Sequence, residues 1–295
     1  MIHVSSGTYN STSLEIFLNF ISCLTSHERK KYVLHTDGEL LKLYATKAGC
    51  SINGLSVQTI SSKQDQLCIT SLLSALSCTK KDELLLTLPA DKSELVYQGK
   101  QFLGHTEFLR SFWNLNHLPM TFITPSLAML LLTDHIPLSQ ASGMIHASFV
   151  CEKVLTFLNT FPKISTIKRI IFWGINPHAG ENNTLGHEEL ELKLAINILE
   201  KQYPQIELIG PIPSDGLFTY QFGGDTLDLI VAPHHDQGLV YLKSTFGFLA
   251  TNVTFGGPII RISPDHGTAI NLLFKKKALY TSLLWTHQLI KSWNY

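Results

Sequence analysis

Three histidines stand at matching places in this chain, a few residues after short apolar runs that read as buried strands. The runs and their histidines are residues 130–132 with His135, residues 170–173 with His178, and residues 229–232 with His235. Polar residues that follow such strands gather at the carboxyl edge of an α/β sheet, where these folds bind ligands. Three imidazoles leave one coordination position open, which is the catalytic arrangement for zinc and also suits cobalt or a similar ion. The pattern favours a catalytic divalent-metal site, with ordinary surface or core histidines as an equally weighted alternative.

Other polar residues indicate that the ligand carries negative charge. Gly104-His105-Thr106-Glu107 opens a helical stretch, where backbone N–H groups and the Thr106 hydroxyl can hold a phosphate or carboxylate. A plain helix cap is the alternative interpretation. Lys243, Asn252 and Arg261 are spaced along a mostly apolar, strand-like region, where an unpaired charge is costly to bury. An anionic partner would satisfy them, and a surface lysine with an ion-paired arginine is the alternative.

The composition fits a globular protein with a small-molecule ligand. Of the 295 residues, 44% are hydrophobic and 16% charged, and 23 basic residues balance 23 acidic ones. This balance gives no electrostatic footprint for nucleic acid or an anionic membrane. The five cysteines are scattered without a C-x-x-C spacing, which favours a reducing, cytoplasmic location over a disulfide framework. The N-terminus lacks the pattern of a signal peptide, and no apolar run is long enough to span a membrane.

The chain must position these residues with alternating strands and helices. Apolar periodicity predicts an α/β rhythm rather than repeats or a coiled coil. The expected strands are residues 31–35, 84–88, 120–123, 128–132, 169–173 and 227–232, and the expected helices are residues 13–25, 138–161 and a segment from His187. Residues 97–104 could cross between two lobes. No G-x-G-x-x-G, G-x-x-x-x-G-K-[ST] or G-x-S-x-G pattern is present, so a dinucleotide would bind outside the common Rossmann fingerprint.

Five short motifs, taken together and in order, give the chain a family resemblance. They are Gly104-His105-Thr106-Glu107-Phe108, Thr133-Asp134-His135-Ile136-Pro137-Leu138, Asn176-Pro177-His178-Ala179-Gly180-Glu181, His235-Asp236-Gln237-Gly238-Leu239 and Pro264-Asp265-His266-Gly267-Thr268-Ala269. From about Gly104 onward the chain resembles the 4-hydroxythreonine-4-phosphate dehydrogenase family of pyridoxal phosphate (vitamin B6) biosynthesis. The resemblance implies a two-lobed isocitrate/isopropylmalate dehydrogenase-like α/β fold with the active site in the interlobe cleft. Its lobes would be residues 1–98 with 271–295, and residues 99–270.

The resemblance also assigns roles to individual residues. His135, His178 and His235 would bind the metal, which could be zinc, magnesium or cobalt, and the substrate would contact His105, Thr106, Lys243, Asn252 and Arg261. Asp236 and Asp265 could orient ligand imidazoles or relay protons, with turn-stabilising aspartates as the alternative. The implied reaction is oxidation of 4-phosphohydroxy-L-threonine by NAD (or NADP) followed by loss of carbon dioxide. The implied assembly is a homodimer whose active site draws on both subunits.

The N-terminal region departs from the family pattern. Where the family has a loop of the type G-[DE]-P-A-G-I-G-P-E, this chain has Ser5-Ser6-Gly7-Thr8-Tyr9-Asn10-Ser11-Thr12-Ser13-Leu14-Glu15. Asp134 stands where a threonine is common beside the first histidine. These changes would chiefly affect positioning. They leave three alternatives: a dehydrogenase of another 4-phosphorylated hydroxy acid such as a threonate or erythronate phosphate, a non-catalytic metabolite-binding paralogue, and a metal-dependent hydrolase.

Overall fold

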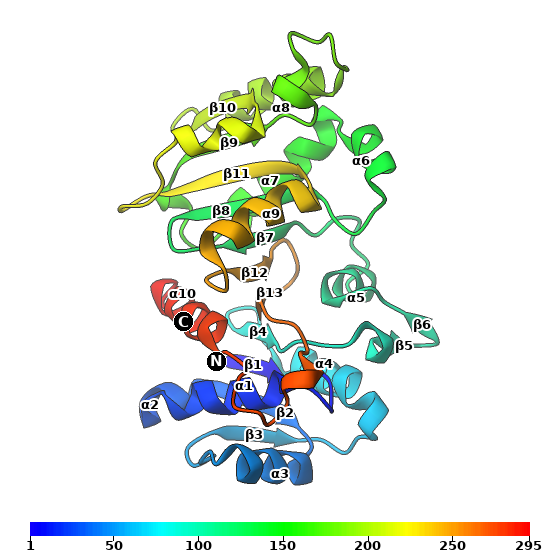
Figure 1. Cartoon of the computed structure of the whole chain (residues 1–295), viewed down its shortest axis with the longest axis vertical. Helices are drawn as coiled ribbons and strands as arrows, with labels where there is room; N and C mark the ends of the chain where they lie inside the picture. The colour runs from blue at the N-terminus through cyan, green and yellow to red at the C-terminus, as the bar shows by residue number, and fades with distance from the viewer. The chain divides into compact units, whose positions relative to one another are not determined.

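The computed structural model describes all of residues 1–295 and divides into two compact units, each built on its own strands. Unit 1 comprises Met1–Asn116 and Gly257–Tyr295, and unit 2 comprises His117–Gly256. Both units combine parallel strands with covering helices (Figure 1). This confirms the predicted α/β class and its organisation around two bodies. None of the helices is both long enough and apolar enough to span a membrane.

Unit 1 contains a parallel sheet in the order β13-β4-β1-β2-β3. Its strands are β1 (Ile2–Ser5), β2 (Tyr32–Thr36), β3 (Ser56–Thr59), β4 (Leu84–Thr87) and β13 (Ile260–Pro264), with a short hairpin of β5 (Val96–Tyr97) and β6 (Lys100–Gln101). Its helices are α1 (Thr12–Ser22), α2 (Ser26–Arg29), α3 (Gly38–Ala48), α4 (Leu67–Cys78), α5 (His105–Phe112) and α10 (Thr281–Ser292). The connection from β3 to β4 runs back across both β2 and β1, so right-handed crossovers place α4 on the opposite face of the sheet from α1 and α3.

Unit 2 contains strands in the order β10-β9-β11-β8-β7-β12. They are β7 (Met120–Ile123), β8 (Leu127–Thr133), β9 (Ile167–Trp173), β10 (Glu207–Ile212), β11 (Leu227–His234) and β12 (Thr251–Thr254), and the helices are α6 (Leu138–Met144), α7 (Ala147–Thr160), α8 (Glu188–Gln202) and α9 (His235–Phe246). Strands β8 to β11 pair in parallel, whereas β7 is antiparallel to β8 and β12. Helix α9 packs on the face that carries Met129 and Leu131, and its Gly238 leaves no space for a Cβ against these two side chains.

The boundaries of the two units differ from those of the lobes expected from the sequence. The lobe boundaries were expected at residues 98/99 and 270/271, whereas unit 2 runs from His117 to Gly256. Strand β13 pairs in parallel with β4, which fixes residues 260–264 in unit 1. The β5–β6 hairpin and α5 also belong to unit 1, because the Phe108 ring packs against Tyr97 and Phe102 at centroid distances of 5.8 and 5.4 Å. Residues 97–104 therefore form this hairpin and the start of α5 rather than a crossover between lobes.

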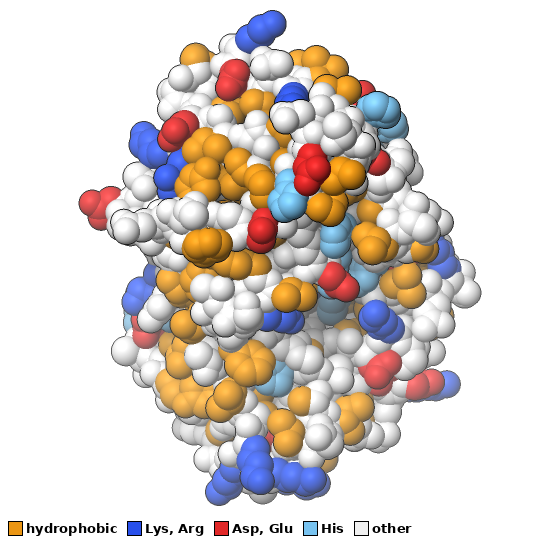
Figure 2. Space-filling model, turned by 45° about the horizontal axis from the view of Figure 1, so that its top comes forward, with side chains coloured by type: hydrophobic (Ala, Val, Ile, Leu, Met, Phe, Trp, Pro, Cys, Tyr) orange, Lys and Arg blue, Asp and Glu red, His pale blue; other side chains and the backbone are white.

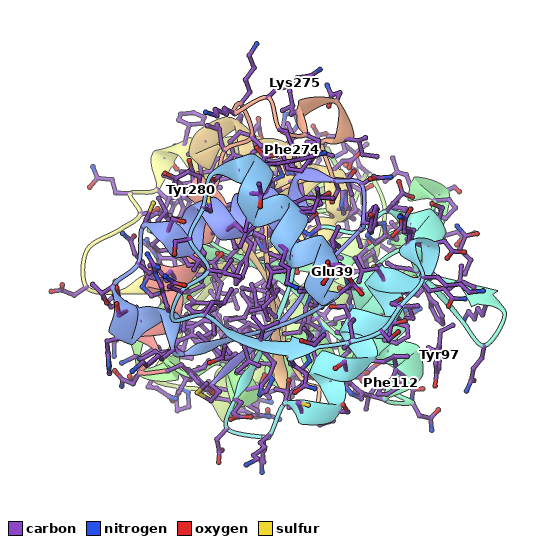
Figure 3. All side chains as sticks on the ribbon, turned by 90° about the horizontal axis from the view of Figure 1, so that it is seen from below. Glu39, Tyr97, Phe112, Phe274, Lys275 and Tyr280 are labelled. Atoms are coloured by element: carbon purple, nitrogen blue, oxygen red, sulfur yellow. The ribbon has the colours of Figure 1, made fainter.

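The segment after β13 is tied back to the first helices of unit 1. The Phe274 backbone N–H donates to the buried carboxylate of Glu15 on α1 at 2.7 Å. The Phe274 ring lies beside α3 (Figure 3), 4.9 Å from the Tyr44 ring centroid and 5.0 Å from the Lys47 amine. These contacts bring the chain's C-terminal part onto helices formed by its first fifty residues.

Candidate functional site

The three predicted metal-binding histidines follow neighbouring parallel strands of unit 2. His135 follows β8, His178 follows β9 and His235 directly follows β11. Strand β11 pairs in parallel with β8 on one side and with β9 on the other, so the three strand ends lie at one edge. This is the edge at which open α/β sheets bind ligands. Histidine side chains with acidic side chains beside them are visible in the upper half of Figure 2.

His135 and His235 lie side by side. Their ring centroids are 5.5 Å apart, with the rings tilted by 45°. Both line a cavity of about 210 Å³ whose wall also includes Thr133, His234 and Asp236. Two imidazoles at this separation can approach one ion, so the structure brings together two of the three predicted ligands.

His178 lies on a neighbouring cavity of about 420 Å³, and its side chain is largely exposed. His234 lines both cavities, so it stands between the His135–His235 pair and the His178 loop. No group of three or more His, Cys, Asp or Glu side chains is arranged around one point so as to hold a metal ion. His178 thus follows a strand next to β11, but its side chain does not form a metal-binding cluster with those of His135 and His235.

The backbone is strained at two of these histidines. His135 and His178 have φ angles of 53° and 52°, in the left-handed region. Non-glycine residues seldom adopt this region, and such strain clusters at functional sites where the surrounding structure enforces it. Other loop residues of the chain, among them Gln98 and Asn114, adopt the same region, so the φ angle is consistent with a functional role for the two histidines without assigning one.

The chemistry of the histidines fits a divalent metal. The Nδ1 atom of His235 is 2.7 Å from the Asp236 carboxylate, and that of His178 is 2.6 Å from the Glu181 carboxylate. A carboxylate on Nδ1 leaves Nε2 as the ligating atom and orients the ring. The same contacts hold the pKa of His178 above its ordinary value and that of Asp236 below it. Asp236 thus contacts the imidazole that the sequence suggested it could orient.

Asp134, the unusual neighbour of His135, faces a buried lysine. Its carboxylate lies 3.9 Å from the Lys153 amine on α7, and both side chains are at most 9% exposed. The Lys153 amine also lies 5.3 Å from the Phe149 ring centroid. Because Lys153 supplies a compensating positive charge, replacing a threonine by Asp134 leaves less net negative charge beside His135 than the sequence alone suggests.

Glu189 organises the loop that carries His178. This fully buried residue of α8 accepts hydrogen bonds from the backbone N–H groups of Ile175 and Asn176 at 3.0 and 2.8 Å, and from the Asn176 side chain at 2.9 Å. A Cβ on Gly180 would lie 2.8 Å from the same carboxylate, so the loop wraps closely around it.

We predict that Glu189→Gln lowers the free energy of unfolding by about 1 to 2 kcal/mol, because hydrogen bonds to an ionised acceptor are stronger than neutral ones. The loss can be measured by urea unfolding at pH 7.5. Glu200→Gln, an exposed position of the same helix, is the control and should change stability little. Equal stability of the Glu189 and Glu200 variants would show that the carboxylate does not hold the loop.

The predicted substrate residues fall in both units. Lys243 lies on α9 and Asn252 on β12, both in unit 2, whereas His105, Thr106 and Arg261 lie in unit 1. The expectation that Lys243 belongs to a strand-like region is wrong. Leu239, Leu242 and Phe246 recur at helical spacing, and this apolar face packs on the sheet as part of α9.

Arg261 and His105 form a buried basic pair in unit 1. The Arg261 guanidinium Nε donates to the Thr87 hydroxyl at 2.8 Å, and its side chain is 4% exposed. Burial lowers the pKa of Arg261 to about 9. Burial first, and then the Arg261 charge, place the pKa of His105 well below its ordinary value, so its imidazole is neutral at pH 7. His105 Nε2 is buried without a hydrogen-bond partner, as expected of an atom that contacts a ligand.

A cavity of about 470 Å³ opens beside His105 at the carboxyl ends of β4 and β13. Its wall includes Pro89, Lys92, Ser263 and His266. The loop after β13 that carries Asp265 provides one side of it. Asp265 itself is half-buried and does not line the cavity.

Three residues that the sequence did not single out contribute to these sites. Thr87 anchors Arg261, and its carbonyl also accepts a hydrogen bond from the Ser263 hydroxyl at 3.0 Å. It is the polar end of the apolar strand β4, so the rule that selected the histidines would have found it. His234 is likewise the last residue of β11. Glu189 does not follow a strand, so the same rule would not have found it. Its hydrogen-bond partners lie in the loop that precedes its helix.

The family described as "Pyridoxal phosphate biosynthetic protein PdxA" matches residues 10–289. A "4-hydroxythreonine-4-phosphate dehydrogenase" from Wigglesworthia glossinidia brevipalpis is 37% identical over 201 residues, which are 67% of this chain and 60% of that protein. The matched part of the chain thus spans about three fifths of this relative.

Solved structures agree on the fold. The crystal structure of a 4-hydroxythreonine-4-phosphate dehydrogenase from Klebsiella pneumoniae covers 100% of this chain and 99% of its own, with a TM-score of 0.79 and 22% identity. An isocitrate dehydrogenase from Methylococcus capsulatus aligns more distantly over 98% of this chain and 84% of its own, with a TM-score of 0.50 and 10% identity. The family match covers nearly the whole chain, and the chain belongs to the PdxA family of pyridoxal phosphate biosynthetic proteins.

Proposed function

We propose that this protein is a metal- and NAD-dependent enzyme that oxidises and decarboxylates 4-phosphohydroxy-L-threonine in pyridoxal phosphate biosynthesis. One observation carries the proposal: His135 and His235 lie side by side at the strand ends of a PdxA-family chain, and His135 has a strained backbone. Relatives named 4-hydroxythreonine-4-phosphate dehydrogenase support the substrate and the oxidation. The proposed location is the cytoplasm.

In this proposal His135, His178 and His235 hold the metal through their Nε2 atoms. When bound, a divalent ion polarises substrate oxygens and NAD accepts a hydride. Asp236 and Glu181 keep the rings of His235 and His178 oriented through Nδ1. A homodimer with a shared active site, which the family resemblance implies, is also part of the proposal.

The residues of the substrate set provide charge and hydrogen bonds. Arg261 and Lys243 supply positive charge for the substrate phosphate, and a guanidinium can bind it bidentately. Neutral His105 offers its unpartnered Nε2 to an anionic oxygen at no cost in additional buried charge. Thr106, which is buried at the start of α5, and Asn252 add polar contacts. Asp265 remains the candidate for proton relay on the loop after β13.

The proposal predicts that purified protein with zinc, NAD and 4-phosphohydroxy-L-threonine produces NADH and carbon dioxide in equal amounts. NADH is followed by absorbance and carbon dioxide by trapping, with magnesium and cobalt in parallel. Turnover of threonate or erythronate phosphate but not of this substrate would move the assignment to another phosphorylated hydroxy acid. No NADH from any of the three, together with ligand-dependent thermal stabilisation, would contradict catalysis and favour a binding protein.

A further inference from the structure

The loop that departs from the family pattern, between β1 and α1, is buried rather than free to close over a site. Only its tip, Tyr9 and Asn10, reaches the surface. The hydroxyl residues of the loop and of the start of α1 are at most 4% exposed, namely Ser6, Thr8, Ser11, Thr12 and Ser13. The Ser6 backbone N–H donates to the Ser71 hydroxyl at 2.8 Å, and the Tyr44 hydroxyl donates to the Ser11 carbonyl at 3.3 Å. Hydroxyl groups thus form hydrogen bonds with the backbone of this loop, where the family pattern has glycine and proline. The loop is a fixed part of unit 1.

The loop holds the segment after β4, which forms one wall of the His105 cavity. The Asp91 backbone N–H donates to the Thr8 hydroxyl at 2.7 Å, and the Ser13 hydroxyl donates to the Pro89 carbonyl at 2.8 Å. The Thr8 N–H also donates to the Pro89 carbonyl at 3.3 Å. At Gly7, whose φ is +71°, a Cβ would lie 2.2 Å from the Pro89 carbonyl oxygen. The two segments are therefore in contact with no room for a larger side chain.

The same loop holds the opposite wall, formed by the segment after β13. The Thr12 backbone N–H and hydroxyl both donate to the Thr268 carbonyl, at 3.0 and 3.1 Å. Thr268 and its neighbour Gly267 line the His105 cavity. One short loop thus fixes both segments whose separation sets the width of this cavity.

Thr8 is the centre of this arrangement. Its hydroxyl accepts from the Asp91 backbone N–H, and its carbonyl accepts from the Ser11 hydroxyl at 2.8 Å. Asp91 precedes Lys92, and both Lys92 and His105 line the cavity. The bond from Thr8 to the Asp91 backbone therefore sets where the chain presents Lys92.

We propose that Thr8 and Thr12 are positioning residues for an anion-binding cavity in which Lys92 acts with His105 on a phosphate or carboxylate group of the substrate. The Lys92 ammonium and the neutral imidazole of His105, which line one cavity, are complementary to one anionic group. In this proposal Lys92 supplies positive charge and His105 supplies a neutral hydrogen-bonding group. Thr8 and Thr12 hold the two walls of the cavity at a fixed separation. The inference deepens the proposed function and rests on it for the identity of the substrate.

The test separates positioning from stability. Thr8→Val removes the hydroxyl but keeps the side-chain shape, and we expect KM for 4-phosphohydroxy-L-threonine to rise about tenfold while kcat stays within about twofold. Thr8→Ser should restore KM. Thr124→Val is the matched control, because the buried Thr124 hydroxyl bridges a turn of unit 2, accepting from Leu127 N–H at 3.1 Å and donating to its carbonyl at 2.9 Å. It should lose stability without a change in KM.

Binding of inorganic phosphate, measured by calorimetry, tests the cavity without turnover. We expect the affinity of the full-length protein to fall about tenfold in Lys92→Met and in Thr8→Val but not in Thr124→Val. Unchanged phosphate affinity and unchanged KM in both cavity variants would overturn the inference. If the wild-type protein forms no NADH but its phosphate affinity still depends on Lys92 and Thr8, the inference stands and the proposed function fails.

Discussion

Replacing His178 with alanine is expected to remove both the bound metal and turnover. The substitution deletes one of three neutral nitrogen donors, and an ion held by two protein ligands binds far more weakly. We expect kcat to fall about a hundredfold to a thousandfold or more, because electrostatic stabilisation of charge that develops in the reaction is lost. Metal content by mass spectrometry of the dialysed protein and NADH formation are the two readouts.

His187→Ala is the control for this experiment. His187 is exposed at the start of α8, close to the His178 loop in sequence, and has no assigned role. It should keep both metal and activity. A His178→Ala protein that retained a full equivalent of metal would overturn the ligand assignment. One that lost the metal but kept its turnover would show that the reaction does not depend on the ion.

Six strands, namely β2, β4, β7, β8, β9 and β11, could be predicted because each is a short apolar run with a clear end, whereas β1, β3, β10, β12 and β13 were not predicted. β7 and β8 form an antiparallel pair, and β9 and β11 end shortly before the predicted histidines. The helix expected over residues 138–161 is instead two helices, α6 and α7. The new start at Ala147 is capped by Glu191 of α8, whose carboxylate accepts from the Ala147 N–H at 2.7 Å. A cap supplied from 44 residues away leaves no local signal.

The candidate site also has one part that the sequence predicts and another that it does not. Position after a strand identified the histidines, since backbone topology alone brings such residues to one edge. The carboxylates that contact two of them are also local, Asp236 beside His235 and Glu181 three residues after His178. The partners of other site residues come from elsewhere in the chain: Thr87 binds Arg261, and Lys153 faces Asp134. Their pairing depends on tertiary packing, which no local spacing encodes. The altered N-terminal loop is the clearest case, because its serines and threonines show their purpose only against Pro89 and Thr268.

Acid is expected to weaken unit 1 through a buried histidine pair that has no part in the proposed chemistry. His3 Nδ1 on β1 lies 2.9 Å from His35 Nε2 on β2, and His35 Nδ1 lies 2.8 Å from the Ser74 hydroxyl. Burial, followed by repulsion from His3, lowers the pKa of His35 to about 4. Burial also lowers the pKa of His3, although Glu83 opposes this and the N-terminal amine and Lys80 reinforce it.

The sign follows from the protons that each state binds. An unfolded histidine has a pKa near 6.5, so between pH 6.5 and 4 the unfolded chain binds a proton that folded His35 does not. Its contribution is complete above pH 6.5 and is lost as the pH falls toward 4. Stability should therefore drop by about 2 kcal/mol from this residue between pH 7.5 and 5. Urea unfolding at the two pH values measures the drop.

His35→Gln isolates this contribution from the other buried histidines. A glutamine amide can donate to His3 but does not titrate, so the variant should lose about 2 kcal/mol less than the wild-type protein over the same pH interval. Lowered pKa values of His105 and His287 leave a residual dependence in both proteins. If the two proteins lose the same stability, the acid response arises at those other histidines, and the His3–His35 pair either keeps its ordinary affinity for protons or is already open at neutral pH.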